Sequence, residues 1–142
     1  MGKMEVGISF LPRFAKDFVS ALPQKAAERA YIVGLAGELG AGKTTFVQEV
    51  AKALGVATPV TSPTFIIASR YPIQKKPFTS LVHMDAYRLG KGESFDWHAY
   101  ANDPQNLVLI EWPERMPDFP PDSPVFSFTV IDETTRDIKT HG

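Results

Sequence analysis

Short apolar runs alternate with amphipathic segments along the first half of the chain, as is typical of an α/β domain. Residues 5–10 predict a short strand, and Pro12 suits the first turn of a helix that runs to about Ala21 or beyond. Residues 30–35 predict a buried strand. Gly55 is placed to end a second helix, which is predicted from apolar residues at helical spacing: Phe46, Val47, Val50, Ala51 and Leu54.

The second half of the chain predicts further strands. Residues 64–71 and 78–84 flank a short Pro- and Lys-rich turn, and if they pair they must be antiparallel, because parallel neighbours need a crossover of about a dozen residues or more. The pattern also predicts a helix over 93–101, a strand over 107–110, and a terminal hairpin from residues 125–131 and 136–140. The expected fold is therefore α/β, with a mixed parallel and antiparallel sheet flanked by helices.

Length and charge narrow the class of protein. A chain of 142 residues with 44% hydrophobic residues predicts a single domain over residues 1–142 with a packed core. Lys plus Arg number 15 against 16 Asp plus Glu, so we expect no DNA binding and only an indirect connection to RNA. The absence of Cys excludes disulfides and thiol nucleophiles. The apolar runs are too short to span a membrane, and a cytoplasmic location is expected.

The stretch GELGAGKT, residues 37–44, lies between the predicted strand and the second helix and matches the Walker A pattern G-x4-G-K-[ST]. Glycines let the backbone turn its amides toward phosphate, and the following helix adds its partial positive charge. Lys43 can reach the β- and γ-phosphates, and the Thr44 hydroxyl can bind Mg²⁺. The nucleotide-binding residues expected here are Gly37, Glu38, Leu39, Gly40, Ala41, Gly42, Lys43, Thr44 and Thr45.

Two acids follow apolar strands, where a carboxylate can reach Mg²⁺ or orient water. Asp85 follows residues 81–84 and Glu111 follows residues 107–110. Either acid alone could equally be a solvated or salt-bridged strand end. Together with the Walker A loop, they indicate at least one metal-site carboxylate. His83 is interpreted as a core histidine within its strand.

A group of hydroxyl residues lies between the second helix and the next strand, where many P-loop proteins place a switch that senses the γ-phosphate. Thr61, Ser62 and Thr64 suit that role. On the residues alone, an ordinary Ser- and Pro-containing turn is the alternative interpretation.

Four stretches in this order resemble the TsaE family, also called YjeE: GELGAGKTTF, VTSPTF, HMDAYRL and IEWPERMP. The resemblance covers about residues 30–117. The resemblance implies a small P-loop NTPase-like fold that binds ATP and Mg²⁺ and hydrolyses ATP weakly. It also implies a role in threonylcarbamoyladenosine modification of tRNA, in support of the TsaD/TsaB complex.

The resemblance assigns roles residue by residue. Lys43, Asp85 and Glu111 would be catalytic, with Thr44 and Glu111 as the Mg²⁺ ligands. Thr61 to Thr64 would form the switch. Trp112 would lie beside Glu111 near the nucleotide, and Arg136 corresponds to a C-terminal arginine close to it.

Three alternative functions are consistent with these residues. The first is an Mg²⁺-dependent ATPase that acts in tRNA modification. The second is a small-molecule kinase, although the six Arg are scattered and form no lid-like cluster. The third is a module whose bound nucleotide assembles a complex without required hydrolysis. A regulatory GTPase is disfavoured because the chain contains no N-K-x-D guanine motif.

Overall fold

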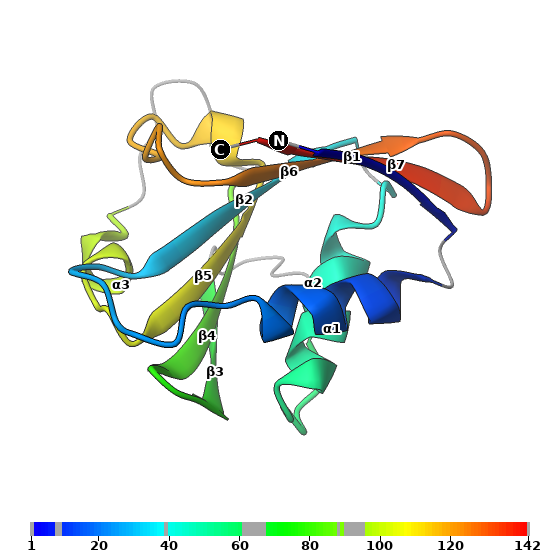
Figure 1. Ribbon diagram of the computed structural model, residues 1–142. Helices are drawn as coiled ribbons and strands as arrows, with labels where there is room; N and C mark the ends of the chain where they lie inside the picture. The colour runs from blue at the N-terminus through cyan, green and yellow to red at the C-terminus, as the bar shows by residue number, and fades with distance from the viewer. Residues whose placement is uncertain are drawn as a thin grey trace.

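One mixed sheet organises the residues that the computed structural model describes, which are 2–7, 10–38, 40–60, 68–87, 89 and 96–141. Its strand order is β1-β7-β6-β2-β5-β4-β3 (Figure 1). The strands are β1 (Gly2–Gly7), β2 (Tyr31–Gly37), β3 (Ala68–Lys75), β4 (Phe78–Asp85), β5 (Asn106–Glu111), β6 (Val125–Val130) and β7 (Thr135–His141). Because β1 pairs with β7, the two ends of the chain lie side by side.

The centre of the sheet is parallel, and its margins are antiparallel. β2 runs parallel to both β5 and β6, and β4 runs parallel to β5. All six residues of β5 are buried, as expected for a strand that is covered on both faces. Parallel strands end at the same edge, so the chain leaves β2, β4 and β5 on one side of the sheet. That edge is where open α/β sheets bind their ligands.

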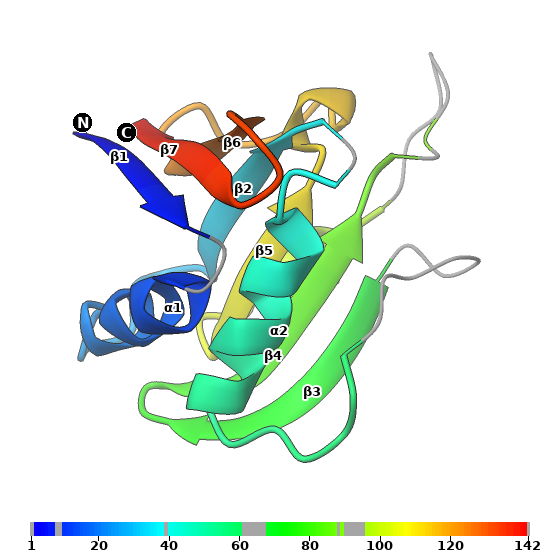
Figure 2. The same cartoon turned by 90° about the vertical axis from the view of Figure 1, so that its right-hand side faces the viewer.

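Helices cover both faces of the sheet. α1 (Leu11–Ser20) and α2 (Lys43–Ala53) pack together on one face, as Figures 1 and 2 show. The short α3 (His98–Ala101) and the 3₁₀ turn η2 (Pro113–Arg115) belong to the other face. Among the helices within the described ranges, none is long and apolar enough to cross a membrane.

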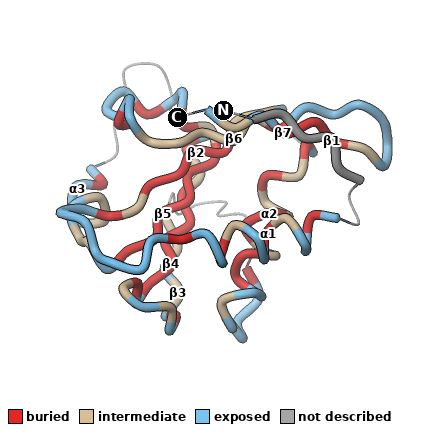
Figure 3. The backbone as a smooth tube through the Cα atoms, in the orientation of Figure 1, coloured by how far each residue is buried: buried red, intermediate tan, exposed pale blue. Residues whose placement is uncertain are grey.

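Each face of the sheet has its own hydrophobic core, and the buried backbone follows the central strands in Figure 3. Leu81, Leu107 and Leu109 join the core under α1 and α2. Their strand neighbours Val82 and Val108 point to the opposite core, which contains Trp97 and Met116. Side chains alternate along a strand, so odd-numbered positions of β4 and β5 face α2. Asp85 and Glu111 are both odd-numbered positions.

The predicted strand over residues 5–10 is wrong in its bounds. β1 covers Gly2–Gly7, and Phe10 caps the start of α1 with an exposed side chain. Pro12 lies in the first turn of α1, where its fixed φ suits a helix and its missing N–H costs no helical hydrogen bond.

Two further predictions differ from the observed elements. Of the helix predicted over 93–101, His98–Ala101 form α3 and residues 96–97 lie before it, while residues 93–95 lie outside the described residues. β3 continues through Pro72 to Lys75, where a turn was predicted. β3 is an edge strand of the sheet, and one of its sides pairs with no other strand among the described residues. A proline is tolerated there, because the N–H that it lacks is not needed on the unpaired side. The antiparallel pairing of β3 with β4 and the β6–β7 hairpin are confirmed.

Candidate functional site

The phosphate-binding loop joins the end of β2 to the first residue of α2. Gly37, Gly40 and Gly42 all have positive φ, at 137°, 78° and 104°. At Gly37 an added Cβ would lie 2.3 Å from the Phe128 carbonyl oxygen, so the position has no room for a side chain. Backbone in such conformations turns successive amides toward a common point, and the α2 N-terminus opens onto the same loop. The loop therefore has the backbone form of an anion site.

Lys43 is the first residue of α2, and its side chain is held inside the site. The residue is 3% exposed, and Nζ donates a hydrogen bond to the Gly37 carbonyl. Nζ also lies 3.8 Å from the centroid of the Trp112 ring, a cation–π arrangement. Burial lowers the pKa of Lys43 below its ordinary value, while the nearby Glu111, Glu114 and Asp85 carboxylates oppose that shift.

Thr44 and Glu111 meet between α2 and the end of β5. Thr44 Oγ1 donates toward the Glu111 carboxylate and lies 3.0 Å from Oε1 and 2.9 Å from Oε2. Glu111 is 3% exposed, and its Oε2 also lies 2.6 Å from His83 Nε2. A hydroxyl and a carboxylate in contact offer the hard oxygen ligands that Mg²⁺ prefers.

Asp85 and Glu111 lie at paired positions at the ends of β4 and β5. The parallel register therefore brings together the two acids that the sequence singled out. Asp85 Oδ1 accepts a hydrogen bond of 2.9 Å from the Tyr87 backbone N–H, which orients the carboxylate as the chain leaves β4. The two acids have different surroundings, because the Glu111 carboxylate contacts Thr44 and His83.

Trp112 adopts the left-handed conformation, with φ 61° and ψ 53°, immediately after β5. Its N–H donates to the Leu35 carbonyl at 3.1 Å, which ties the turn to β2. The indole ring packs against Tyr87 at a centroid distance of 5.0 Å, and the Arg115 guanidinium lies 5.6 Å from the indole centroid. The turn thus places the indole ring over Lys43.

Arg136 reaches the phosphate-binding loop from β7. Its side chain is largely buried and donates to the Gly40 carbonyl at 3.3 Å, and to the Asp132 and Thr135 carbonyls at 2.8 and 3.1 Å. Nε has no hydrogen-bond partner among the described residues. The structure therefore places Arg136 against the backbone of the loop.

The donor set of this site fits a magnesium–nucleotide complex. Among the residues that the structure describes, no group of three or more His, Cys, Asp and Glu could hold a metal ion. Mg²⁺ is commonly bound through one or two protein oxygens, with substrate phosphates and water completing its coordination. Thr44 and Glu111 could supply the protein oxygens, and the loop amides with Lys43 could hold the phosphates.

The structure brings most of the predicted site residues together. Lys43, Thr44, Glu111 and Trp112 are linked by direct contacts, and Arg136 touches the loop. Ala41 is buried, whereas Glu38 and Gly40 are exposed. Thr45 is the third residue of α2. The remaining predictions, Leu39 and the switch residues Thr61, Ser62 and Thr64, lie outside the described residues.

The sequence interpretation missed the contact between His83 and Glu111. His83 is fully buried, as expected of a core histidine, yet its Nε2 reaches Glu111. The available signal was its spacing of two residues from Asp85, which puts both side chains on the same face of β4.

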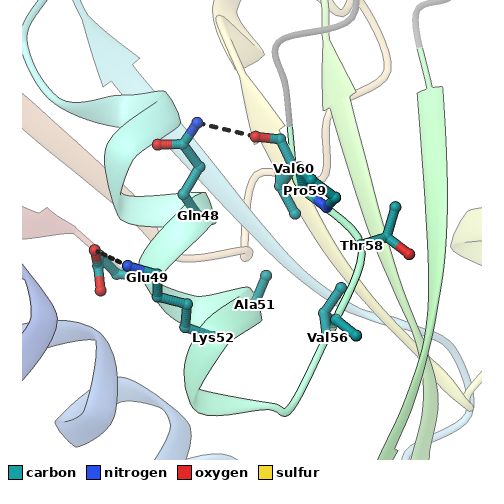
Figure 4. A pocket seen from close by; sticks show the side chains of 9 residues that line it. Gln48, Glu49, Ala51, Lys52, Val56, Thr58, Pro59 and Val60 are labelled. Carbon is teal, nitrogen blue, oxygen red and sulfur yellow. Dashed lines mark hydrogen bonds and ion pairs between the residues drawn. The ribbon is translucent and has the colours of Figure 1, made fainter.

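A cavity of about 290 Å³ lies beside the second half of α2 (Figure 4). The helix contributes Gln48, Glu49 and Lys52, and the segment 56–60 forms the other wall. Gln48 Nε2 donates to the Val60 carbonyl at 2.9 Å across it. Its lining, among the residues that the structure describes, includes none of the phosphate-binding loop.

The strand, glycine loop and helix at the edge of a mixed sheet define a P-loop NTPase-like α/β protein. The crystal structure of the Bacillus protein YdiB has the same fold, with a TM-score of 0.65 and 25% identity, over 96% of this chain and 83% of that one. The family profile described as threonylcarbamoyl adenosine biosynthesis protein TsaE matches residues 11–138. The chain belongs to the TsaE family.

The relatives of this chain include proteins of three organisms that carry the name tRNA threonylcarbamoyladenosine biosynthesis protein TsaE. The Aquifex aeolicus protein is 37% identical over 112 residues, which cover 78% of this chain and 76% of the relative. The Synechocystis protein is 37% identical over 63% of this chain and 58% of its own length. The Streptomyces coelicolor protein is 44% identical over 58% of this chain and 57% of its own length. The chain thus matches between about half and three quarters of these relatives' lengths.

Proposed function

We propose that this chain binds ATP with Mg²⁺ and hydrolyses it in support of threonylcarbamoyladenosine modification of tRNA in the cytoplasm. The observation that carries the proposal is the contact between Thr44 and Glu111 beside the Walker A loop, which joins a phosphate site to a metal-binding oxygen pair. The names of the TsaE relatives supply the pathway.

In this proposal the residues of the site have separate roles. The loop amides and Lys43 hold the phosphate chain, and the oxygens of Thr44 and Glu111 hold the metal ion. Mg²⁺ neutralises charge that develops on the phosphates during transfer to water. Asp85, at the end of the neighbouring strand, orients the attacking water and accepts its proton. Arg136 keeps the Gly40 carbonyl in place, so that the loop presents its amides to the nucleotide.

Hydrolysis would be slow alone and stimulated by the TsaD/TsaB complex, which transfers the threonylcarbamoyl group. With Lys plus Arg at 15 and Asp plus Glu at 16, the chain has no net positive charge to favour direct tRNA binding. The tRNA would therefore contact the partners rather than this chain.

Complementation tests the pathway. Cells that lack their own TsaE should regain threonylcarbamoyladenosine in tRNA when they express this chain, as measured by mass spectrometry of tRNA nucleosides. Lys43→Ala should fail, because it removes the cation that holds the phosphates. Lys52→Ala on the same helix is the control, since that side chain is exposed, and it should complement fully. A parent chain that is produced in folded form but restores no modification would contradict the pathway.

Turnover tests the reaction. With the TsaD/TsaB pair present, labelled ATP should release free phosphate, and Lys43→Ala should slow this by at least about 10²-fold. Transfer of the label to a metabolite would instead identify a kinase. If Glu111→Ala binds ATP but supports many rounds of tRNA modification without phosphate release, hydrolysis is not required, and the nucleotide serves assembly.

A further inference from the structure

His83 is fully buried, and its imidazole has a single hydrogen-bond partner among the described residues. The residue is 0% exposed and lies in β4 between the core residue Leu81 and Asp85 at the strand's end, two positions from each. A buried polar group is costly unless it forms a hydrogen bond. Its Nδ1 has no partner among the described residues, so the contact with Glu111 satisfies the imidazole through Nε2 alone.

The direction of that hydrogen bond follows from its partner. An ionised carboxylate only accepts hydrogen bonds, so His83 Nε2 carries the proton and donates it to Glu111 Oε2 at 2.6 Å. A hydrogen bond to a charged acceptor is stronger than a neutral one. The donor therefore holds one oxygen of Glu111 firmly from the side of β4.

The Thr44 hydroxyl is less able to fix the carboxylate. It lies at nearly equal distances from Oε1 and Oε2, 3.0 and 2.9 Å, and its single proton can serve one oxygen at a time. With Oε2 held by His83, the carboxylate plane is set and Oε1 is oriented beside the Thr44 oxygen. Without His83, the carboxylate plane of Glu111 could rotate about the last side-chain bond, and neither oxygen would be held toward the Thr44 oxygen.

We infer that His83 is a positioning residue, which orients the Glu111 carboxylate so that it and Thr44 bind a divalent cation together. The inference rests on the proposed function, since it concerns how the chain binds the metal that accompanies ATP. Groups that orient a metal ligand commonly change metal affinity about 10- to 100-fold when they are replaced. His83 would act through Glu111 and would not touch the nucleotide.

Two amide substitutions separate positioning from packing. In His83→Gln the amide nitrogen reaches the place of Nε2 and can still donate to Glu111. In His83→Asn the amide nitrogen reaches only the place of Nδ1 and cannot. Calorimetry gives the ATP affinity in Mg²⁺ and in EDTA, and the ratio of the two measures what the metal contributes. The ratio needs no turnover.

We expect His83→Asn to lose about tenfold or more of the Mg²⁺-dependent ratio while its ATP affinity in EDTA stays that of the parent. His83→Gln should keep the parent ratio. An unchanged ratio in His83→Asn, an equal loss in both variants, or a loss of ATP affinity in EDTA would overturn the inference. A residue that serves packing alone would lower the melting temperature of both variants and leave the ratio unchanged.

Failure of the proposed function gives a different result. A parent chain whose ATP affinity is the same in Mg²⁺ and in EDTA overturns both proposals, whereas a metal-dependent parent matched by His83→Asn overturns the positioning role alone. If His83→Asn does not fold, His83→Leu takes its place as the variant without a donor. A loss of about tenfold in its ratio that His83→Gln does not share supports the role, and an unchanged ratio in His83→Leu overturns it.

Discussion

Gly37 and Trp112 hold unusual backbone conformations on neighbouring sides of the site. Gly37 has a φ of 137° where the chain leaves β2, and Trp112 has a φ of 61° where it leaves β5. A left-handed tryptophan costs about 1–2 kcal/mol of backbone strain. The bond from its N–H to Leu35 and its ring contacts with Tyr87 and Lys43 offset that cost. Both conformations bring groups toward the phosphate-binding loop.

Replacing Gly37 by Ala should destabilise the fold through a steric clash. The new Cβ would lie 2.3 Å from the Phe128 carbonyl oxygen, so β2 and β6 would have to separate. We expect a loss of about 3 kcal/mol or more in unfolding free energy. Gly55→Ala is the control, because its φ is also positive but its Cβ would meet nothing within 4 Å. Its expected loss is about 1 kcal/mol. Urea denaturation compares the two, and equal losses would contradict the explanation.

The residues of the site differ in how far sequence alone could predict them. The loop pattern predicted the places of Lys43 and Thr44, and the strand-end rule singled out Asp85 and Glu111. Asp85 lies opposite Glu111 only because β4 and β5 are neighbouring strands. Local sequence patterns do not encode which strands are neighbours. The bond from His83 to Glu111 was not predicted, because it requires both the strand register and a particular side-chain rotamer.

Aromatic rings join α1, α2 and β6 into one layer under the site. Phe46 of α2 is fully buried and packs against Phe14, Phe18, Phe126 and Phe128 at centroid distances of 5.3 to 5.9 Å. Such aromatic pairs contribute about 0.5–1.5 kcal/mol beyond the area that they bury. Phe46 lies one turn after the phosphate-binding loop, so this layer also sets where α2 begins.

Phe46→Ala should therefore leave a cavity that its rigid neighbours cannot fill. We expect a loss of about 3–5 kcal/mol in unfolding free energy, as is usual for a buried phenylalanine. Phe10→Ala is the matched control, because Phe10 is 61% exposed and should change stability by less than about 0.5 kcal/mol. Chemical denaturation of both variants measures the difference. A loss below about 1 kcal/mol for Phe46→Ala would show that this layer does not hold α2.

The start of α3 carries an exposed histidine whose titration reports a local contact. His98 Nδ1 lies 2.8 Å from Asp96 Oδ1, and that hydrogen bond raises the pKa of His98 above its ordinary value of 6.5. A raised pKa in the folded state stabilises the fold fully below pH 6.5, and that stabilisation is lost as the pH rises through the raised pKa. Asp118, at 4.0 Å from Nε2, adds a smaller upward effect on the same pKa.

NMR titration of the His98 ring protons tests this contact. The midpoint should lie above 6.5, and Asp96→Asn should move it down because it removes the charged acceptor. Asp118→Asn should move it down by less. An unchanged midpoint in Asp96→Asn would show that the hydrogen bond does not form in solution.

Comparison of the observed with the predicted elements shows which local sequence patterns are enough to predict a strand or a helix. β2, the glycine loop and α2 were predicted because a buried apolar run, a motif and a helical period follow one another without a gap. The β6–β7 hairpin was predicted from the apolar run over residues 125–131, which a polar turn joins to a second strand segment over residues 136–140. The extension of β3 through Pro72 was not, because a proline is a breaker in a central strand but is tolerated at an edge that only tertiary structure defines.

The sheet as a unit explains why residues far apart in sequence form one site. β2 lies between β5 and β6, so the loop that follows β2 is flanked by Glu111 at the end of β5 and by β6 on its other side. Arg136 reaches the loop from β7, although 96 positions separate it from Gly40. Local patterns predicted a mixed sheet, but they did not predict this strand order, which depends on pairings such as β1 with β7.

Calorimetric titration of the folded parent chain with ATP, in the presence and absence of Mg²⁺, tests most directly whether the loop and the Thr44–Glu111 pair form a nucleotide site. ATP should bind, and Mg²⁺ should raise its affinity. Lys43→Ala should lose at least about tenfold, since a hydrogen bond to a charged group contributes about 1.5–3 kcal/mol. Lys52→Ala, whose side chain is exposed, should bind like the parent. A folded parent chain that takes up no ATP in magnesium buffer would contradict the assignment of this site.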